Sequence, residues 1–190
     1  MARIADPGAD PGNETVAAAF RVFREEGREP IALYRYLAAA PEMLRGFSEL
    51  SRALRYEGRT SRALRELVIL RAAQLTRSSY EWYHHTPMAA KTGIAAEKID
   101  QLERWREAGD LYSDGERAAL AAAEEIVAAG LSDSGFAALR TSFDDGEIVE
   151  LVLLVTHYLA VSRIIGSLRI DVEPEYLVAD PRWPWPPAAP

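Results

Sequence analysis

The side chains best suited to chemistry in this sequence lie in one short segment, SSYEWYHH, at residues 78–85. Glu81 and His85 are four residues apart, so on a helix their side chains stand on the same face, one turn apart. A carboxylate beside an imidazole raises the pKa of the imidazole and orients the ring, which suits proton transfer near neutral pH. Ordinary solvated Glu–His pairs share this spacing, so spacing alone leaves a catalytic and a structural interpretation open.

Other polar and aromatic side chains of the segment could contact a substrate. Ser78 lies three residues before Glu81 and joins the same helix face. The adjacent His84 and His85 point about a hundred degrees apart, so we expect that they do not serve one small site through the same face. Tyr80 can be a core side chain or part of a substrate site, because its ring is apolar and its hydroxyl is polar.

Composition excludes several kinds of function. The sequence has 190 residues and no cysteine, which removes disulfides, cysteine-based zinc sites and thiol nucleophiles. Its formal net charge of −7 argues against nucleic-acid binding, since phosphate recognition needs a basic face. The first residues contain no apolar stretch typical of a secretory signal, and the expected location is therefore cytoplasmic.

The pattern along the chain is helical almost throughout. Residues 14–175 are expected to form a single all-α domain, since no alternating run of β-branched residues is long enough for a sheet. Residues 1–13 are expected to be a flexible N-terminal segment and residues 176–190 a Pro/Trp-rich tail. Trp183 and Trp185 in the tail are expected to dock on the protein or on a neighbouring subunit. Helices are expected at about residues 14–26, 31–40, 42–56, 61–75, 78–92, 97–106, 113–130, 133–143 and 144–170.

The last of these helices is apolar on more than one face between Ile148 and Val155. Glu150, His157 and Arg163 interrupt it at helical spacing, so we expect a buried helix and no membrane span. Enclosure of this helix on most sides predicts a subunit contact, and hence a homo-oligomer with closed symmetry, such as a dimer, trimer or hexamer.

Two longer segments carry a family resemblance. LRELVILRAAQLTRSSYEWYHHTPMAAKTGI, at residues 64–94, resembles the signature of the carboxymuconolactone decarboxylase / AhpD-like superfamily. EIVELVLLVTHYLAVSRIIGSLRIDVEP, at residues 147–174, resembles the closing helix of that family. The resemblance covers roughly residues 30–175 in order, and it implies an all-α, AhpD-like helical bundle assembled as a homo-oligomer.

The peroxidase members of this superfamily carry a Cys-x-x-Cys-x-x-x-His motif and a glutamate on the preceding helix. When the motif histidine is aligned with His85, Ser78 and Glu81 fall at the two cysteine positions and Glu66 falls at the upstream glutamate. Without a thiolate there is no peroxidatic attack and no resolving disulfide, so a thiol peroxidase is chemically excluded.

The decarboxylase branch lacks the cysteine pair, needs no cofactor and removes CO₂ from a carboxylated muconolactone. The resemblance therefore implies a cofactor-free lyase or isomerase that acts on a small carboxylated molecule, lactone-like or keto-acid-like. His85 would be the general acid/base, Glu66 would orient and tune it, and Glu81 would be a second proton-handling group. The residues expected to bind substrate are Ser78, Tyr80, His84 and His157.

Two other interpretations stay open. Glu66, Glu81 and the three histidines could supply metal ligands, although no second helix repeats the motif, and the expected site therefore contains no metal. Alternatively, the chain could be a non-catalytic, ligand-binding oligomer that kept the fold after both cysteines were lost. His157 could also be a core histidine, and Arg71 could bind either a substrate carboxylate or an interface glutamate.

Overall fold

The computed structural model describes residues 2–9 and 12–177, and over these residues the chain is helical with no strand. The expectation of an all-α fold is confirmed. The expected position of Trp183 and Trp185 lies outside the described residues. The elements are α1 (Glu14–Glu25), α2 (Ala32–Leu37), α3 (Pro41–Tyr56), α4 (Arg62–Thr76), α5 (Ser79–Lys91), α6 (Ala96–Asp100), the 3₁₀ helices η1 (Leu102–Glu107) and η2 (Gly109–Leu111), α7 (Asp114–Ala128), α8 (Asp133–Arg140), α9 (Asp145–Leu168) and α10 (Pro174–Leu177).

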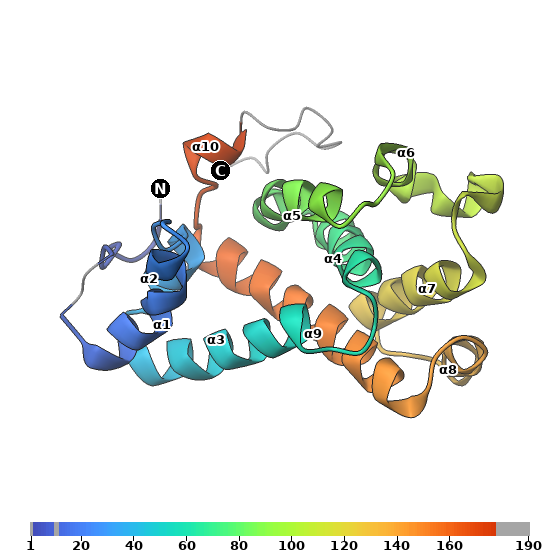
Figure 1. Cartoon of the computed structure of the whole chain (residues 1–190), viewed down its shortest axis with the longest axis horizontal. Coiled ribbons are helices and arrows are strands. Elements are labelled where there is room, and N and C mark those ends of the chain that lie inside the picture. The colour runs from blue at the N-terminus through green and yellow to red at the C-terminus, as the bar shows by residue number, and fades with distance from the viewer. Residues whose placement is uncertain (1, 10–11, 178–190) are drawn as a thin grey trace.

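The helices are arranged around α4 and α9. α9 runs diagonally through the molecule, with α1–α3 at one end and α7 and α8 at the other (Figure 1). α4 packs against α5, α7 and α9 and is buried along most of its length. Because α4 meets neighbours on several sides, its polar residues, including Glu66, are held inside the protein.

Local sequence signals account for most helix ends. Ser113 and Asp144 begin α7 and α9 with capping boxes completed by Glu116 and Glu147, as their spacing predicts. Pro41 stands in the first turn of α3, where its missing N–H costs no hydrogen bond. Arg77 ends α4 in the left-handed conformation at φ 54°, so the chain turns back at once into α5.

The structure differs from the sequence pattern in two places. The expected helix at residues 97–106 is a five-residue α6 followed by the 3₁₀ helix η1. Arg104 has non-helical backbone angles there, while Leu102 and Trp105 are buried, so tertiary packing outweighs local helix propensity. The second difference is α10, a short helix that the sequence pattern does not predict and that crosses the anticipated boundary between residues 175 and 176.

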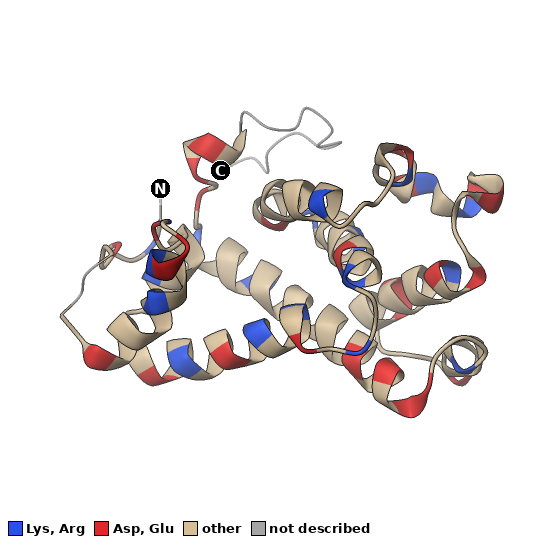
Figure 2. Cartoon of the chain, viewed as in Figure 1, with Lys and Arg blue, Asp and Glu red and all other residues tan. Residues whose placement is uncertain are grey.

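α9 is long and apolar enough to cross a membrane by length and composition alone, with a mean hydropathy of 1.8 over its most apolar 18 residues. No charged residue lies between Glu150 and Arg163 (Figure 2). Within the fold this helix contacts α3, α4, α5, α7 and α8 and supplies much of the core. Val149 and Leu153 nevertheless remain 56% and 46% exposed, so one apolar face is uncovered in the single chain.

Candidate active site

Glu66 and His85 meet where α4 packs against α5. Glu66 is fully buried, and its Oε2 lies 2.7 Å from Nδ1 of His85. Its Oε1 forms an ion pair with Arg62, one turn earlier on α4. Burial opposes the charge on Glu66, but His85, the hydrogen bond to it and Arg62 together hold the pKa of this carboxyl below its usual value. An ionised Glu66 can only accept, so Nδ1 of His85 carries the proton and Nε2 is left for chemistry.

Glu81 faces the other nitrogen of the same ring. Its Oε2 is 3.5 Å from Nε2 of His85, as the four-residue spacing predicts. Burial raises the pKa of Glu81, and the nearby His85, His84 and Arg55 offset only part of that effect. One imidazole therefore lies between an ionised carboxylate, Glu66, and a carboxyl group whose pKa is raised, Glu81. Two carboxyl groups with pKa values moved in opposite directions are suited to different roles in proton transfer.

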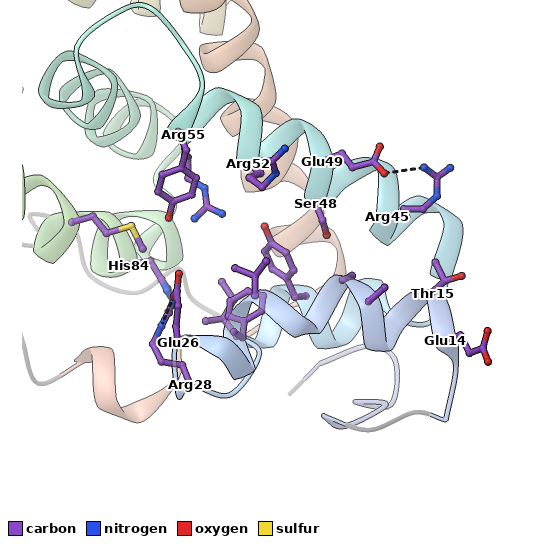
Figure 3. Close-up of a pocket in the computed structure, with 18 of the residues that line it drawn as sticks. Glu14, Thr15, Glu26, Arg28, Arg45, Ser48, Glu49, Arg52, Arg55 and His84 are labelled. Carbon is purple, nitrogen blue, oxygen red and sulfur yellow. Dashed lines mark hydrogen bonds and ion pairs between the residues drawn. The ribbon is translucent and has the colours of Figure 1, made fainter.

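Two connected hollows lead to this group. An inner cavity of about 40 Å³ is bordered by Glu81, His85, His84, Tyr80 and His157. An outer pocket of about 540 Å³ lies between α1, α3, α5 and α10 (Figure 3). The outer pocket has the size of a small-molecule site, whereas the inner cavity has room for little more than a water or one substituent. The residues that border both are Ile31, Tyr34, Arg55, His84 and Met88.

Tyr80 and His84 form a wall of the inner cavity and are held by Glu173. The Tyr80 hydroxyl donates to Glu173 Oε1 at 3.2 Å and accepts from the backbone N–H of Leu33 at 3.1 Å. Nε2 of His84 lies 2.8 Å from Glu173 Oε2, and its ring stacks between Tyr80 and Tyr176 at 4.3 and 3.8 Å. His84 and His85 therefore border one small cavity from different faces of α5, in agreement with the expectation that they do not serve one site through the same face.

His157 reaches the inner cavity from α9. Its Nε2 lies 2.9 Å from the Ser51 hydroxyl, and its ring packs 5.0 Å from Phe47. Burial, assisted by the charge of Arg55, lowers the pKa of His157 to about 4. It is a neutral imidazole at neutral pH and could offer a substrate one hydrogen bond without a charge.

Ser78 has a structural position. Its hydroxyl accepts from the backbone N–H of Glu81 at 3.4 Å as the N-cap of α5, and it borders neither hollow. We expect Ser78→Ala to lower the free energy of unfolding by about 1 kcal/mol through loss of the cap. Turnover should change less than about threefold, a difference of about 0.6 kcal/mol. Urea unfolding measures the stability and steady-state kinetics measures the turnover. A loss of turnover without a loss of stability would show that Ser78 contacts the substrate after all.

The structure places Arg71 away from both hollows and places Arg55 beside them. Arg71 faces α7, where Glu124 accepts from its Nε at 3.1 Å and from Trp105 at 2.8 Å, so its glutamate partner lies in the same chain. Arg55 on α3 borders both hollows, and the sequence reasoning misses it. A signal was available, since Arg55 follows Ser51 and Leu54 at the spacing of one helix face, and both of these are buried.

Among the residues that the structure describes, no group of three or more His, Asp or Glu side chains is arranged to hold a metal ion. The candidate ligands are instead engaged in separate pairs. Glu66 and Glu81 flank His85, while His84 contacts Glu173 and His157 contacts Ser51.

The helical fold is AhpD-like, and where α4 packs against α5 it brings together Glu66, His85 and Glu81. Residues 41–125 match the carboxymuconolactone decarboxylase family. The resemblance stated above is thereby confirmed: this segment matches the carboxymuconolactone decarboxylase family, the fold is shared with AhpD-like proteins, and the sequence has no cysteine.

Solved structures share the fold. An Agrobacterium tumefaciens protein of unknown function, described in connection with the antioxidant defence protein AhpD, is 26% identical with a TM-score of 0.65, over 73% of this chain and 95% of that chain. A peroxidase-related AhpD core protein from Ralstonia eutropha JMP134 is 17% identical with a TM-score of 0.78, over 94% and 95%. A cysteine-to-alanine variant of the debrominase Bmp8, in complex with 2,3,4-tribromopyrrole, is 15% identical with a TM-score of 0.78, over 94% and 97%. No curated protein matches the sequence significantly.

Proposed function

We propose that this protein is a cofactor-free proton-transfer enzyme, a decarboxylase-like lyase or an isomerase, acting on a small carboxylated lactone or keto acid. The observation that carries the proposal is the buried line Arg62–Glu66–His85–Glu81, which ends at the inner cavity. A buried histidine between an ionised and a protonated carboxyl group can both accept and donate a proton without a cofactor.

The chemistry follows from the order of these groups. In a decarboxylation, the bond between a substrate carbon and its carboxylate breaks, and the electron pair remains as an enolate while CO₂ leaves. Glu81 then donates its proton to that carbon, and His85 supplies a new proton to Glu81 from solvent. The balance is one substrate carboxylate and one proton converted to CO₂ and a C–H bond. In an isomerisation, Nε2 of His85 accepts a proton from one carbon and Glu81 donates one to another.

A structural neighbour supports a small cyclic substrate. The Bmp8 structure holds 2,3,4-tribromopyrrole within the same fold, so that fold can enclose a single ring. The alanine substitution in that structure replaces a cysteine of the debrominase, whereas the present chain has no cysteine. The chemistry proposed here therefore uses Glu81 and His85 in place of a thiol.

Incubation with a panel of carboxylated lactones, β-keto acids and vinylogous acids tests the proposal. We expect at least one compound to release CO₂ or to isomerise, as followed by CO₂ detection and product mass. Binding without turnover across the panel, by folded protein, would contradict enzyme function and favour a non-catalytic ligand-binding oligomer.

We also propose that the protein forms a homo-oligomer through the exposed apolar face of α9. Val149 and Leu153 lie at i and i+4 on this face, and contiguous exposed apolar side chains often mark protein contacts. Leu153→Glu should convert an oligomer into a monomer of 21.0 kDa in light scattering. Met43→Glu, at an exposed apolar residue of α3, is the matched control and should leave the mass unchanged. A monomeric wild-type protein, or an unchanged mass for Leu153→Glu, would contradict this contact.

A further inference from the structure

Arg55 occupies the junction between the two hollows. It reaches from α3 into the space that faces α5 (Figure 3), and it borders the outer pocket and the inner cavity together with His84 and Met88. Its Nε donates to the backbone carbonyl of Ser51 at 3.2 Å, and its guanidinium lies 5.2 Å from the ring centre of Tyr56. These contacts hold the side chain in place at the junction.

The other arginines around the outer pocket are neutralised by neighbouring carboxylates. Arg28 pairs with Glu26. Arg45 pairs with Glu42 at 3.1 Å and with Glu49 at 3.0 Å. Arg52 pairs with Glu57. Within the described part of the chain, Arg55 is the pocket arginine that has no carboxylate within ion-pair distance.

Burial opposes the charge of Arg55 and the carboxylate of Glu66 acts on it only from a distance, so a ligand carboxylate would supply the direct partner that it lacks. Arg55 already acts on the groups around it, because its charge lowers the pKa of His157 and opposes the effect of burial on the pKa of Glu81. Arginine binds a carboxylate through two parallel hydrogen bonds, which sets the orientation of the ligand as well as its affinity. A carboxylate at Arg55 would place the rest of a small ligand against the inner cavity, the outer pocket or both.

The lining of the outer pocket indicates the chemical character of the rest of the ligand, beyond its carboxylate. Near Arg55 and along α1 the walls are mainly apolar or aromatic, and the other pocket arginines, Arg28, Arg45 and Arg52, are already paired with carboxylates, so they are not free to bind a second anionic group. The volume of about 540 Å³ suits an organic molecule with a ring or a short chain. The apolar and aromatic lining residues include Val22, Phe23, Ile31, Tyr34, Tyr56 and Tyr176.

We propose that Arg55 is the carboxylate anchor of this site and that its ligands are monocarboxylates with an apolar body, not dicarboxylates. This inference rests on the proposed function, for which it specifies the substrate class. The carboxylate would bind Arg55 and the apolar body would lie between α1 and α3. A reacting carbon close to the carboxylate would then border the inner cavity, where Glu81 and His85 lie.

Isothermal titration with benzoate, phenylacetate, 4-phenylbutyrate, cyclohexanecarboxylate and octanoate at pH 7.5 tests the anchor directly. We expect at least one to bind the wild-type protein, and its carboxamide to bind at least tenfold more weakly. Phenylsuccinate should bind more weakly than the matching monocarboxylate. Arg55→Met should weaken binding of the acid at least tenfold without affecting the amide, and Arg55→Lys should recover part of the loss.

Arg59→Met is the matched control, because it removes the same charge at an exposed position that is paired with Asp144 and borders neither hollow. Its effect should stay below threefold. No binding by any acid, equal binding of acid and amide, tighter binding of phenylsuccinate, or an unchanged affinity in Arg55→Met would each overturn the inference. The comparison of acid with amide uses the wild-type protein and stands even where a variant fails to fold.

Titration measures binding without turnover, so the two proposals can fail separately. Binding that depends on Arg55 in a protein with no turnover would support the carboxylate anchor and contradict the proposed enzyme function. Turnover with a kcat/KM that is unchanged in Arg55→Met would support the proposed enzyme function and contradict the role of Arg55 as the carboxylate anchor.

Discussion

Replacing His85 with glutamine should lower kcat by about 10²–10⁴-fold, the usual contribution of a positioned general acid/base. Glutamine can still donate a hydrogen bond to Glu66, but it cannot accept and release a proton near neutral pH. The substitution therefore separates the chemistry of His85 from its structural bond of 2.7 Å to Glu66. Steady-state kinetics on a substrate identified from the panel, with circular dichroism to verify folding, measures the effect.

Thr86→Val provides the matched control for His85. Thr86 is the next residue on α5, is also buried, and donates to the backbone carbonyl of Trp82 at 2.8 Å without bordering either hollow. Its replacement should keep kcat within about threefold, close to 0.6 kcal/mol in the barrier. A folded His85→Gln protein with the kcat of the wild type would show that this histidine is not the acid/base.

Glu81→Gln should abolish most turnover and yet stabilise the protein at neutral and alkaline pH. The variant keeps the size and polarity of the side chain but has no proton to donate to a substrate carbon. We expect kcat to fall by about 10²-fold or more. A loss of activity combined with a gain in stability is typical of a residue whose placement serves function at the expense of the fold.

The sign of the stability effect follows from the raised pKa of Glu81. Below the unfolded-state value of 4.5, both states carry the proton and the wild-type stability is complete. As pH rises, the unfolded chain loses this proton first, so the free energy of unfolding falls until the pH passes the folded-state pKa. The slope in that window is at most about 1.4 kcal/mol per pH unit. His84, His85, Arg55 and Glu66 all act on Glu81, so the wild-type slope is measured together with that of the variant.

Urea unfolding of the wild type and Glu81→Gln between pH 5 and 8 measures this difference. The free energy of unfolding of the variant should increase relative to the wild type as pH rises. Glu66 contributes in the opposite direction, because its lowered pKa gives stability that is present above 4.5 and is lost as pH falls through the folded-state pKa. Parallel stability curves for the two proteins would mean that the pKa of Glu81 is the same in the folded and unfolded states.

The helices and one half of the site could be predicted from the sequence, because both depend on short-range spacing. The caps at Ser113 and Asp144 and the pairing of Glu81 with His85 are local features of three or four residues. The contact between Glu66 and His85 joins two helices, and nothing in the periodicity of either helix predicts it. It is expected only because the family resemblance places a glutamate there.

The remaining features depend on packing between distant segments. Glu173 lies 89 residues from His84 in the chain, and Arg55 reaches the site from a helix that precedes the family signature. Spacing cannot show which side of α4 faces α5, so the sequence leaves Arg71 open as a substrate-binding residue although it faces Glu124. Ser78 is mistaken for a substrate contact because a residue on the right face and a helix cap look the same in sequence.

The most direct test of the central claim is the position of solvent hydrogen in the product. A substrate from the panel is converted in D₂O by the wild type, His85→Gln and Glu66→Gln, and the product is analysed by mass and NMR. The account predicts one deuterium at one carbon for each wild-type turnover, and a rate reduced by at least tenfold in both variants. Product without deuterium, or equal rates in all three proteins, would contradict proton transfer through Glu66, His85 and Glu81.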